Sequence, residues 1–133
     1  MNRRRFLRNI GAASLLFPVG RPELFDAVVT DAHDEVLEIQ VKHARPASSW
    51  IWGAFKMSGA VLHDMHELWR SRDPSDEYMG TLVNAYLALG GRAVGIRAGH
   101  SYVDVGTLHG YREANQLLDA RRSAESLPVS ESA

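Results

Sequence analysis

Two stretches rich in β-forming residues, 24–30 (LFDAVVT) and 35–42 (EVLEIQVK), flank the polar segment 31–34 near the start of the chain. Two such runs joined by a short polar link predict a β-hairpin. Strict alternation in the second run predicts a half-buried strand, because successive side chains of a strand point to opposite faces. Leu37, Ile39 and Val41 are expected on the apolar face, with Val36, Glu38 and Gln40 on the other.

An aromatic stretch, 50–57 (WIWGAFKM), follows the Pro- and Ser-containing loop 43–49 and predicts a third strand. Gly53 interrupts this strand, and glycine in a strand often marks a bulge or a close backbone approach. Two helices are expected next, because the apolar period changes after Ser58, which is available as N-cap. Their apolar positions are Val61, Leu62, Met65, Leu68 and Trp69, and then Met79, Leu82, Val83, Tyr86 and Leu87.

The two helices are separated by a turn containing Pro74, and the second is closed by Gly90 and Gly91. Short strands are expected at 92–98 and 101–105, and a last helix, capped by Thr107, runs to about residue 122. The resulting order of strands and helices predicts an α/β or α+β domain.

The composition excludes some classes of function and does not by itself indicate one. The 133 residues are enough for one domain, and 15 Lys and Arg balance 16 Asp and Glu to a formal net charge of -1. We therefore expect neither a nucleic-acid partner, which needs a basic field, nor a membrane partner. The absence of cysteine from the sequence excludes disulfides, thiol catalysis and zinc-thiolate sites.

The segment 102–107 (YVDVGT) carries the main chemical signal of the sequence. Asp104 stands where a strand is expected to end, and such ends are where α/β folds place their sites. Its carboxylate could bind a hard cation such as magnesium, while Gly106 lets a ligand approach the backbone and Thr107 caps the helix. The alternative is that Asp104 and Thr107 only shape a strand-to-helix turn.

The longer segment 102–118 (YVDVGTLHGYREANQLL) resembles the C-terminal signature of sugar-phosphate nucleotidyltransferases, the glucose-1-phosphate thymidylyltransferase and uridylyltransferase group. The likeness extends upstream to residue 15, through 16–18 (LFP), 36–42 (VLEIQVK) and 50–55 (WIWGAF). It implies an α/β fold that is a partial nucleotidyltransferase fold, Rossmann-like with a mixed sheet. The portion represented would be the C-terminal one, which binds the sugar phosphate.

The resemblance also implies roles for single residues. Asp104 matches an aspartate that holds catalytic magnesium, and Lys42 matches a lysine that contacts the phosphate of sugar 1-phosphate. These two are the catalytic candidates. Gly53 would lie against the sugar, and Gly106 and Thr107 complete the implied substrate-binding set.

The sequence departs from that family at two places. Lys42 lies between Val41 and His43, where the family has Glu-Lys-Pro, so the carboxylate expected to accept sugar hydroxyls is missing. The sequence also lacks a glycine-rich nucleotide loop and a second metal aspartate. We therefore expect a chain that is inactive alone and needs a second chain supplying the nucleotide-binding half, or a homo-oligomer.

The chain is expected to divide into a basic and apolar N-terminal segment (1–14), a nucleotidyltransferase-like portion (15–122) and a disordered tail (123–133). The first eight residues hold four arginines, and the order from Arg3 to Leu7 followed by apolar residues is typical of a twin-arginine export signal. No small-residue cleavage site follows. Residues 15–19 cannot be both signal and folded strand, and we favour the strand and a cytoplasmic protein.

Two other readings of the sequence remain. His63 and His66 lie three apart on the first expected helix, within reach of a shared transition metal, but no third ligand is evident and a solvated helix face is the alternative. Trp50 and Trp52 share one strand face, so the chain could instead be an exported or cytosolic non-catalytic module that binds carbohydrate or protein. Core packing is the simpler explanation of these aromatics.

Overall fold

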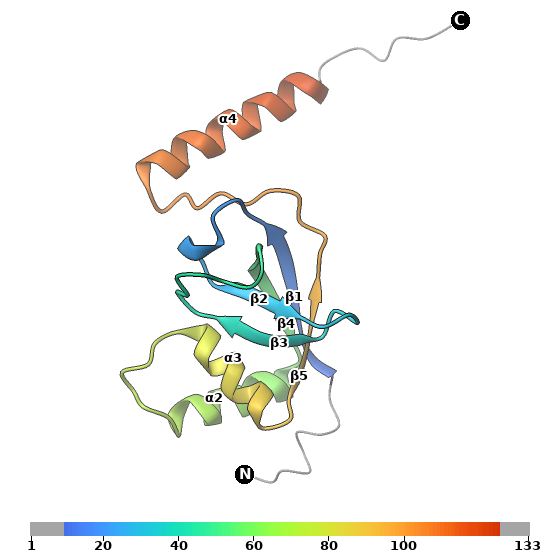
Figure 1. Cartoon of the computed structure of the whole chain (residues 1–133), viewed down its shortest axis with the longest axis vertical. Helices are drawn as coiled ribbons and strands as arrows, with labels where there is room; N and C mark the ends of the chain where they lie inside the picture. The colour runs from blue at the N-terminus through green and yellow to red at the C-terminus, as the bar shows by residue number, and fades with distance from the viewer. Residues whose placement is uncertain (1–9, 126–133) are drawn as a thin grey trace, which may run out of the picture. The chain divides into compact units, whose positions relative to one another are not determined.

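A computed structural model describes residues 10–125 of the chain (Figure 1). These residues form two compact units, and the boundary along the chain lies between Ser101 and Tyr102. Each unit is described by itself. The first unit holds a five-stranded mixed sheet of order β3-β2-β4-β1-β5 and two α-helices, and the second holds one long helix. The elements are β1 (Ile10–Pro18), the short 3-10 helix η1 (Pro22–Leu24), β2 (Ala27–Thr30), β3 (Val36–Gln40), β4 (Trp50–Met57), α2 (Gly59–Arg70), α3 (Met79–Ala88), β5 (Arg92–Ile96) and α4 (Leu108–Glu125).

β1 is the strand that joins the sheet together. It pairs antiparallel with β4 from Ala12 to Pro18 and parallel with β5 from Ile10 to Leu15. Leu16 of β1 is fully buried. The apolar run after the arginines is therefore a folded strand, as expected, although it begins at Ile10 rather than at residue 15, because β5 supplies a partner for its first residues.

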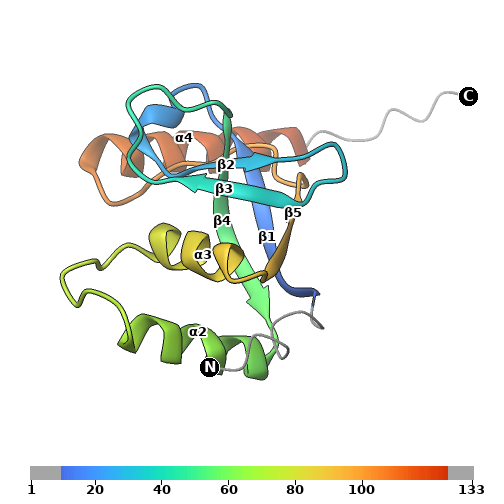
Figure 2. The ribbon, with the colours of Figure 1, turned by 60° about the horizontal axis from the view of Figure 1, so that its bottom comes forward.

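The β2–β3 hairpin does not lie alongside the other strands but runs across them (Figures 1 and 2). β2 meets β4 at one residue pair, Ala27 with Ile51. The far end of the hairpin reaches β5, where the amide of Gly95 donates to the carbonyl of Asp34 over 2.8 Å. The hairpin and α3 enclose the core between them, with Val28 and Ile39 almost fully buried.

The predicted faces of β3 are wrong at Leu37. Val29 pairs with Glu38 while Thr30 pairs with Val36, so Leu37 is an extra residue that forms a β-bulge. A bulge shifts the alternation by one residue, which puts Val36 and Ile39 both into the core and leaves Leu37 59% exposed. Alternation along a sequence cannot reveal such a shift, because the bulge depends on the register with β2.

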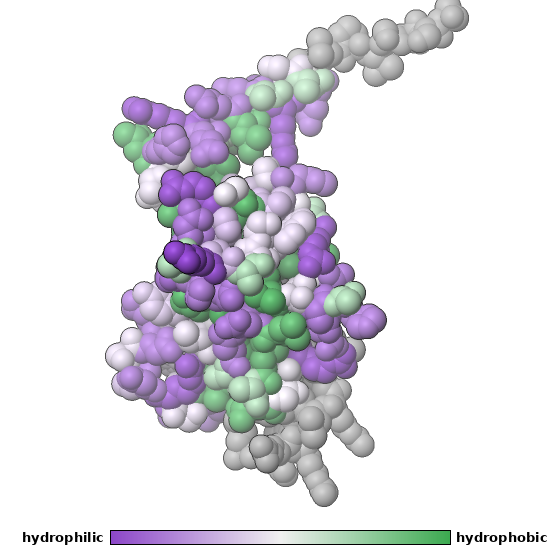
Figure 3. Space-filling view, viewed as in Figure 1, coloured by the Kyte–Doolittle hydropathy of each residue, from purple (hydrophilic) through white to green (hydrophobic). Residues whose placement is uncertain are grey.

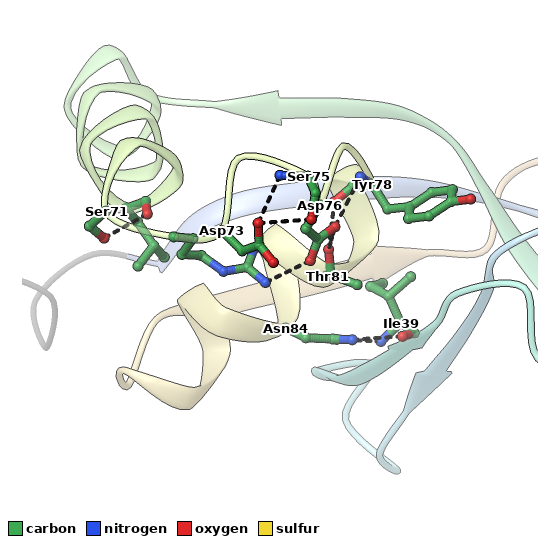
Figure 4. A network of polar contacts seen from close by, with 10 residues as sticks. Ile39, Ser71, Asp73, Ser75, Asp76, Tyr78, Thr81 and Asn84 are labelled. Carbon is green, nitrogen blue, oxygen red and sulfur yellow. Dashed lines mark hydrogen bonds and ion pairs between the residues drawn. The ribbon is translucent and has the colours of Figure 1, made fainter.

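Both predicted helices of the first unit are confirmed, together with their ends. The hydroxyl of Ser58 accepts from the amide of Val61 at the start of α2. Before α3, the Asp76 carboxylate accepts from the Thr81 hydroxyl over 2.6 Å and from the Tyr78 amide (Figure 4). The hydrogen bond from Thr81 is the main cause that holds the pKa of Asp76 below its ordinary value. Gly90, with φ of 88°, follows α3 in the left-handed conformation that ends helices.

The segment expected as a strand at 101–105 is not one. A strand needs a ladder with a neighbouring strand, and residues 101–105 belong to none of the strands of the sheet in the described part of the chain. The last helix, α4, is confirmed and continues to Glu125, three residues beyond its predicted end, so 123–125 are helical. Residues 126–133 of the expected tail, and the arginine cluster, lie outside the described residues.

Asn84 of α3 fixes the helix to the edge of β3. Its side-chain carbonyl accepts from the amide of Ile39 and its amide donates to the carbonyl of Ile39, both over 2.7 Å (Figure 4). The Asn84 side chain therefore satisfies the backbone N–H and C=O groups of one β3 residue, as a neighbouring strand would.

We expect Asn84→Ala to lower the free energy of unfolding by about 2 kcal/mol, because it leaves both backbone groups of Ile39 without partners. Urea denaturation followed by circular dichroism measures this change. His63→Ala, at an exposed position of α2, is the control and should stay within about 0.5 kcal/mol of the unchanged protein. Equal effects of the two substitutions would contradict the assigned role of Asn84.

Candidate functional site

Asp104, Gly106 and Thr107 lie together in a tight turn at the start of the second unit. One carboxylate oxygen of Asp104 accepts from the amide of Gly106 over 2.9 Å. The next residue after Gly106 is Thr107, whose hydroxyl accepts from the amide of Gly110 over 3.0 Å, which makes Thr107 the N-cap of α4 as predicted. The sequence motif is thus a turn whose side chains satisfy backbone amides and present a carboxylate in front of a helix.

Gly110 explains why this turn needs a glycine inside a helix. A Cβ atom at Gly110 would lie 1.7 Å from the backbone carbonyl oxygen of Asp104. The first turn of α4 can therefore rest against the Asp104 carbonyl only if residue 110 has no side chain, and Gly110 is the buried residue of this helix. In the sequence, Gly110 lies within the segment 102–118 that carries the family resemblance, and it is not among the candidate site residues. Its signal was a glycine placed where helix propensity favours alanine.

The Asp104 carboxylate is exposed and has one oxygen bonded to the Gly106 amide. Magnesium in phosphate-transferring sites takes one or two carboxylates, and the substrate phosphates and water supply the remaining oxygens. Asp104 fits one of those ligand positions. Within residues 10–125, no three His, Asp or Glu side chains are grouped closely enough to hold a metal by themselves. A complete magnesium site therefore needs ligands beyond this turn.

Lys42 follows β3 in the left-handed backbone conformation, with φ of 48°. Its amide donates to the carboxylate of Asp26, which lies just before β2 on the neighbouring strand. This bond fixes the backbone at the end of the hairpin and leaves the Lys42 side chain exposed. Within the described part of the chain its ammonium group forms no ion pair. A positive charge held at a sheet end is available to an anionic ligand.

Gly53 is the extra residue of a bulge in β4, because Leu16 pairs with Trp52 while Leu15 pairs with Ala54. A Cβ atom there would lie 2.4 Å from the ring of Phe17. The interruption noted in the sequence therefore has a packing cause within the chain, and the role of Gly53 against a sugar stays a prediction.

Lys42 and Gly53 lie at the same end of the sheet. The amide of Lys42 donates to the carboxylate of Asp26. Ala27, the residue after Asp26, pairs with Ile51 of β4, which lies two residues before Gly53. The structure thus brings these two candidates to one region of the first unit, whereas Asp104, Gly106 and Thr107 form the turn of the second unit.

The two tryptophans of β4 are engaged in packing. The guanidinium of Arg97 lies 5.6 Å from the centre of a Trp50 ring, which is a cation–π contact. Trp52 contacts Phe55 edge-on, with ring centroids 4.0 Å apart. Both tryptophans are half-buried and pack against the core. A free stacking platform on this strand face has no support in these contacts.

The histidine pair of α2 is exposed, and the ring of His66 stacks on Trp69 with centroids 5.9 Å apart. Among residues 10–125, no third His, Asp or Glu side chain joins this pair to form a group that could hold a metal ion. In residues 10–125 there is also no helix that is both long enough and apolar enough to cross a membrane.

The arrangement of strands and helices is similar to that of two solved enzymes. One is a protein assigned as a glucose-1-phosphate thymidylyltransferase of Bacillus anthracis, crystallised with sucrose, with a TM-score of 0.66 and 23% identity over 91% of this chain. The other is a CMP:2-keto-3-deoxy-manno-octonic acid synthetase in complex with CTP, with a TM-score of 0.56 and 12% identity over 84% of this chain. The fold is a nucleotidyltransferase fold.

The chain spans 46% and 50% of the length of those two structures, about half of each. No family model matches the sequence. No curated protein was found to be similar in sequence. The structural similarity therefore supports the fold alone. Roles for single residues have to be argued from the geometry described above.

Gly110→Ala tests the close approach in the turn. Alanine favours a helix by about 1 kcal/mol over glycine, so propensity alone predicts a more stable α4. The contact with the Asp104 carbonyl predicts the opposite, and we expect amide exchange over residues 104–112 to become about tenfold faster.

Hydrogen-exchange mass spectrometry measures this change. Gly59→Ala, in the first turn of α2, is the matched control, because a Cβ there meets nothing within 4 Å. It should leave exchange unchanged or slower. Slower exchange in Gly110→Ala as well would contradict the steric role.

Proposed function

We propose that this chain is the sugar-phosphate-binding portion of a nucleotidyltransferase that makes nucleoside diphosphate sugars from a nucleoside triphosphate and a sugar 1-phosphate. The observation that carries the proposal is the turn from Asp104 to Gly110, in which each motif residue has a geometric role on a nucleotidyltransferase fold. An accidental likeness of sequence would not be expected to give such a set of mutually dependent contacts.

In this proposal Lys42 and Asp104 each help to neutralise phosphate charge, Lys42 in the first unit and Asp104, through magnesium, in the second. Lys42 neutralises phosphate oxygens of the sugar 1-phosphate at the end of the hairpin, where its side chain is exposed and its backbone is held by Asp26. Asp104 offers one carboxylate oxygen to magnesium, which would neutralise phosphate charge during nucleotidyl transfer. Gly53, Gly106 and Thr107 are assigned to the backbone surface that the sugar phosphate approaches.

The nucleotide would be bound by a second chain or by a further copy of this one. The sequence contains neither a glycine-rich phosphate loop nor a second metal aspartate in the expected pattern, and positioning of both substrates is what catalyses phosphoryl transfer. We place the protein in the cytoplasm, because residues 10–18 form β1, which pairs with strands on both sides and which a cleaved export signal would remove.

Binding of glucose 1-phosphate tests the role of Lys42. The chain has two lysines, Lys42 and Lys56, and both are exposed, so each serves as the control for the other. We expect Lys42→Gln to weaken binding at least about tenfold in calorimetry, because a charge-assisted hydrogen bond is lost. Lys56→Gln should bind as the unchanged protein does. Equal affinities of the two variants would show that Lys42 does not contact the phosphate.

Pyrophosphate release tests the need for a partner. With glucose 1-phosphate, a nucleoside triphosphate and magnesium, we expect the chain alone to release no pyrophosphate above the rate without protein, because one carboxylate and one lysine do not position both substrates. Asp104→Asn is the informative variant, since an amide keeps an acceptor for Gly106 and loses the charge. Release by the chain alone that this variant abolishes would overturn the proposed dependence on a partner.

A further inference from the structure

α2 has a wider apolar face than the core of the first unit covers. The residues of this helix that are buried in the core are Val61, Met65 and Leu68. Leu62 and Trp69 belong to the same helix, yet they are 58% and 48% exposed. With His66 between them, they follow one another at intervals of four and three residues, so they form a second stripe beside the buried one. Part of the apolar surface of α2 is therefore open to solvent.

This open stripe lines a groove between α2 and the start of α3. Nine residues line the groove, around a volume of about 280 Å³. Its ionisable side chains are His66, Glu77 and Tyr78, and the other lining side chains are Met, Leu and Trp. Figure 3 shows apolar side chains at the surface around α3, beside the polar loop between α2 and α3. An apolar hollow with a few polar groups is typical of a small-molecule site.

Hydrogen bonds hold in place the end of the loop that carries Glu77 and Tyr78 (Figure 4). The Asp76 carboxylate accepts from the amide of Tyr78 over 3.2 Å and from the guanidinium of Arg72 over 3.0 Å. The carbonyl of Tyr78 in turn accepts from the hydroxyl of Thr81 over 2.8 Å. This side of the groove is therefore positioned before any ligand binds, which lowers the entropic cost of binding.

Two aromatic side chains line the groove and remain accessible in it. Trp69 and Tyr78 are each 48% exposed. The indole of Trp69 stacks on the ring of His66, with centroids 5.9 Å apart, and this contact restricts its orientation. The faces of indole and phenol rings are electron-rich, so they attract a cation that lies over them. Accessible rings at two sides of one groove thus favour a ligand that carries positive charge.

The charged groups around the groove favour the same kind of ligand. Glu77 is the carboxylate among its lining residues, and the lining contains neither Lys nor Arg. Arg70 and Arg72, the arginines of the neighbouring segment, are paired with Glu67 over 3.5 Å and with Asp76 over 3.0 Å. In the part of the chain that the structure describes, Glu77 forms no ion pair. A cation in the groove would therefore meet an unneutralised carboxylate, and an anion would be repelled.

We propose that the groove between α2 and α3 binds a small organic cation, an ammonium that carries methyl or alkyl groups. Its charge lies against the rings of Trp69 and Tyr78, with the Glu77 carboxylate as the opposite charge. Its hydrocarbon groups contact the methionine and leucine side chains of the lining, two of which, Met65 and Leu82, are buried. The site uses none of the residues assigned to nucleotidyl transfer, so it does not depend on the proposed function.

The size and the side chains of the groove favour this ligand over other occupants. A specific protein interface takes about 20–30 residues from each partner, whereas nine residues line this groove. A metal ion is disfavoured, because among residues 10–125 no three His, Asp or Glu side chains are grouped closely enough to hold one. An alkylated ammonium is also a poor hydrogen-bond donor, which suits a lining that offers few acceptors.

Choline and 3,3-dimethylbutan-1-ol test the site, because they have nearly the same shape and differ in the positive charge. Each is titrated into the full chain at pH 8, where histidine side chains are neutral, and the backbone amide signal of Tyr78 is followed by nuclear magnetic resonance. We expect choline to shift this signal to saturation and the alcohol to bind at least about tenfold more weakly. Equal affinities of the two molecules, or no saturable shift with choline, would contradict the proposal.

Two variants locate the cation within the groove. We expect Trp69→Leu to weaken choline binding at least about tenfold and Glu77→Gln to weaken it about threefold, because an exposed charge pair contributes less than an aromatic face. Phe55→Leu and Glu38→Gln, at exposed positions of β4 and β3 outside the groove, are the matched controls and should bind as the unchanged protein does. Equal weakening by variants and controls would place the cation elsewhere and rule out this site.

Analytical ultracentrifugation tests the other occupant, a second copy of the chain. Leu62 is 58% exposed, so Leu62→Glu adds a charge to the groove without removing core packing. We expect this variant to sediment as the unchanged protein does, which supports a small-molecule site. Self-association of the unchanged protein that Leu62→Glu abolishes would show that the groove is a contact between copies, and the proposal would be wrong. If Trp69→Leu fails to fold, the comparison of choline with the alcohol in the unchanged protein still decides the outcome.

Discussion

The pairing of β1 with strands on both of its sides is the constraint on which the sheet depends. β1 joins β4 and β5, which lie far apart in the sequence, and its Leu16 is fully buried. Removing β1 would leave β5 with only its contacts to the end of the hairpin, and it would expose the core that α3 and the hairpin enclose. The same apolar run that resembles the hydrophobic region of an export signal is thus the structural centre of the first unit.

Two bulges shape the end of the sheet where Lys42 and Gly53 lie. The bulge at Leu37 lets the hairpin twist across the sheet while Val36 and Ile39 both stay in the core. The bulge at Gly53 makes room for the Phe17 ring beside β4. Because the hairpin leaves β4 after Ile51, Lys42 lies at this end of the sheet, and within residues 10–125 β1 is the strand that pairs with the part of β4 beyond Gly53.

The turn of the second unit shows why a motif with fixed spacing can be informative. Asp104 bonds to Gly106, Thr107 bonds to Gly110, and Gly110 must lack a side chain because it rests on the Asp104 carbonyl. Each residue type is set by a neighbour fewer than seven positions away. Such local dependence keeps the spacing fixed, and the turn presents one exposed carboxylate, that of Asp104.

The sequence by itself determined what depends on near neighbours in the chain: the hairpin, α2 with its Ser58 cap, the end of α3 at Gly90, and α4 with its Thr107 cap. It also identified Asp104, Gly106 and Thr107 as a group, because their contacts are local. Tertiary structure alone decided the bulge at Leu37, the pairing of Asn84 with β3, and the common sheet end of Lys42 and Gly53. These features depend on which strand meets which and in what register, and periodicity within a single segment does not encode that.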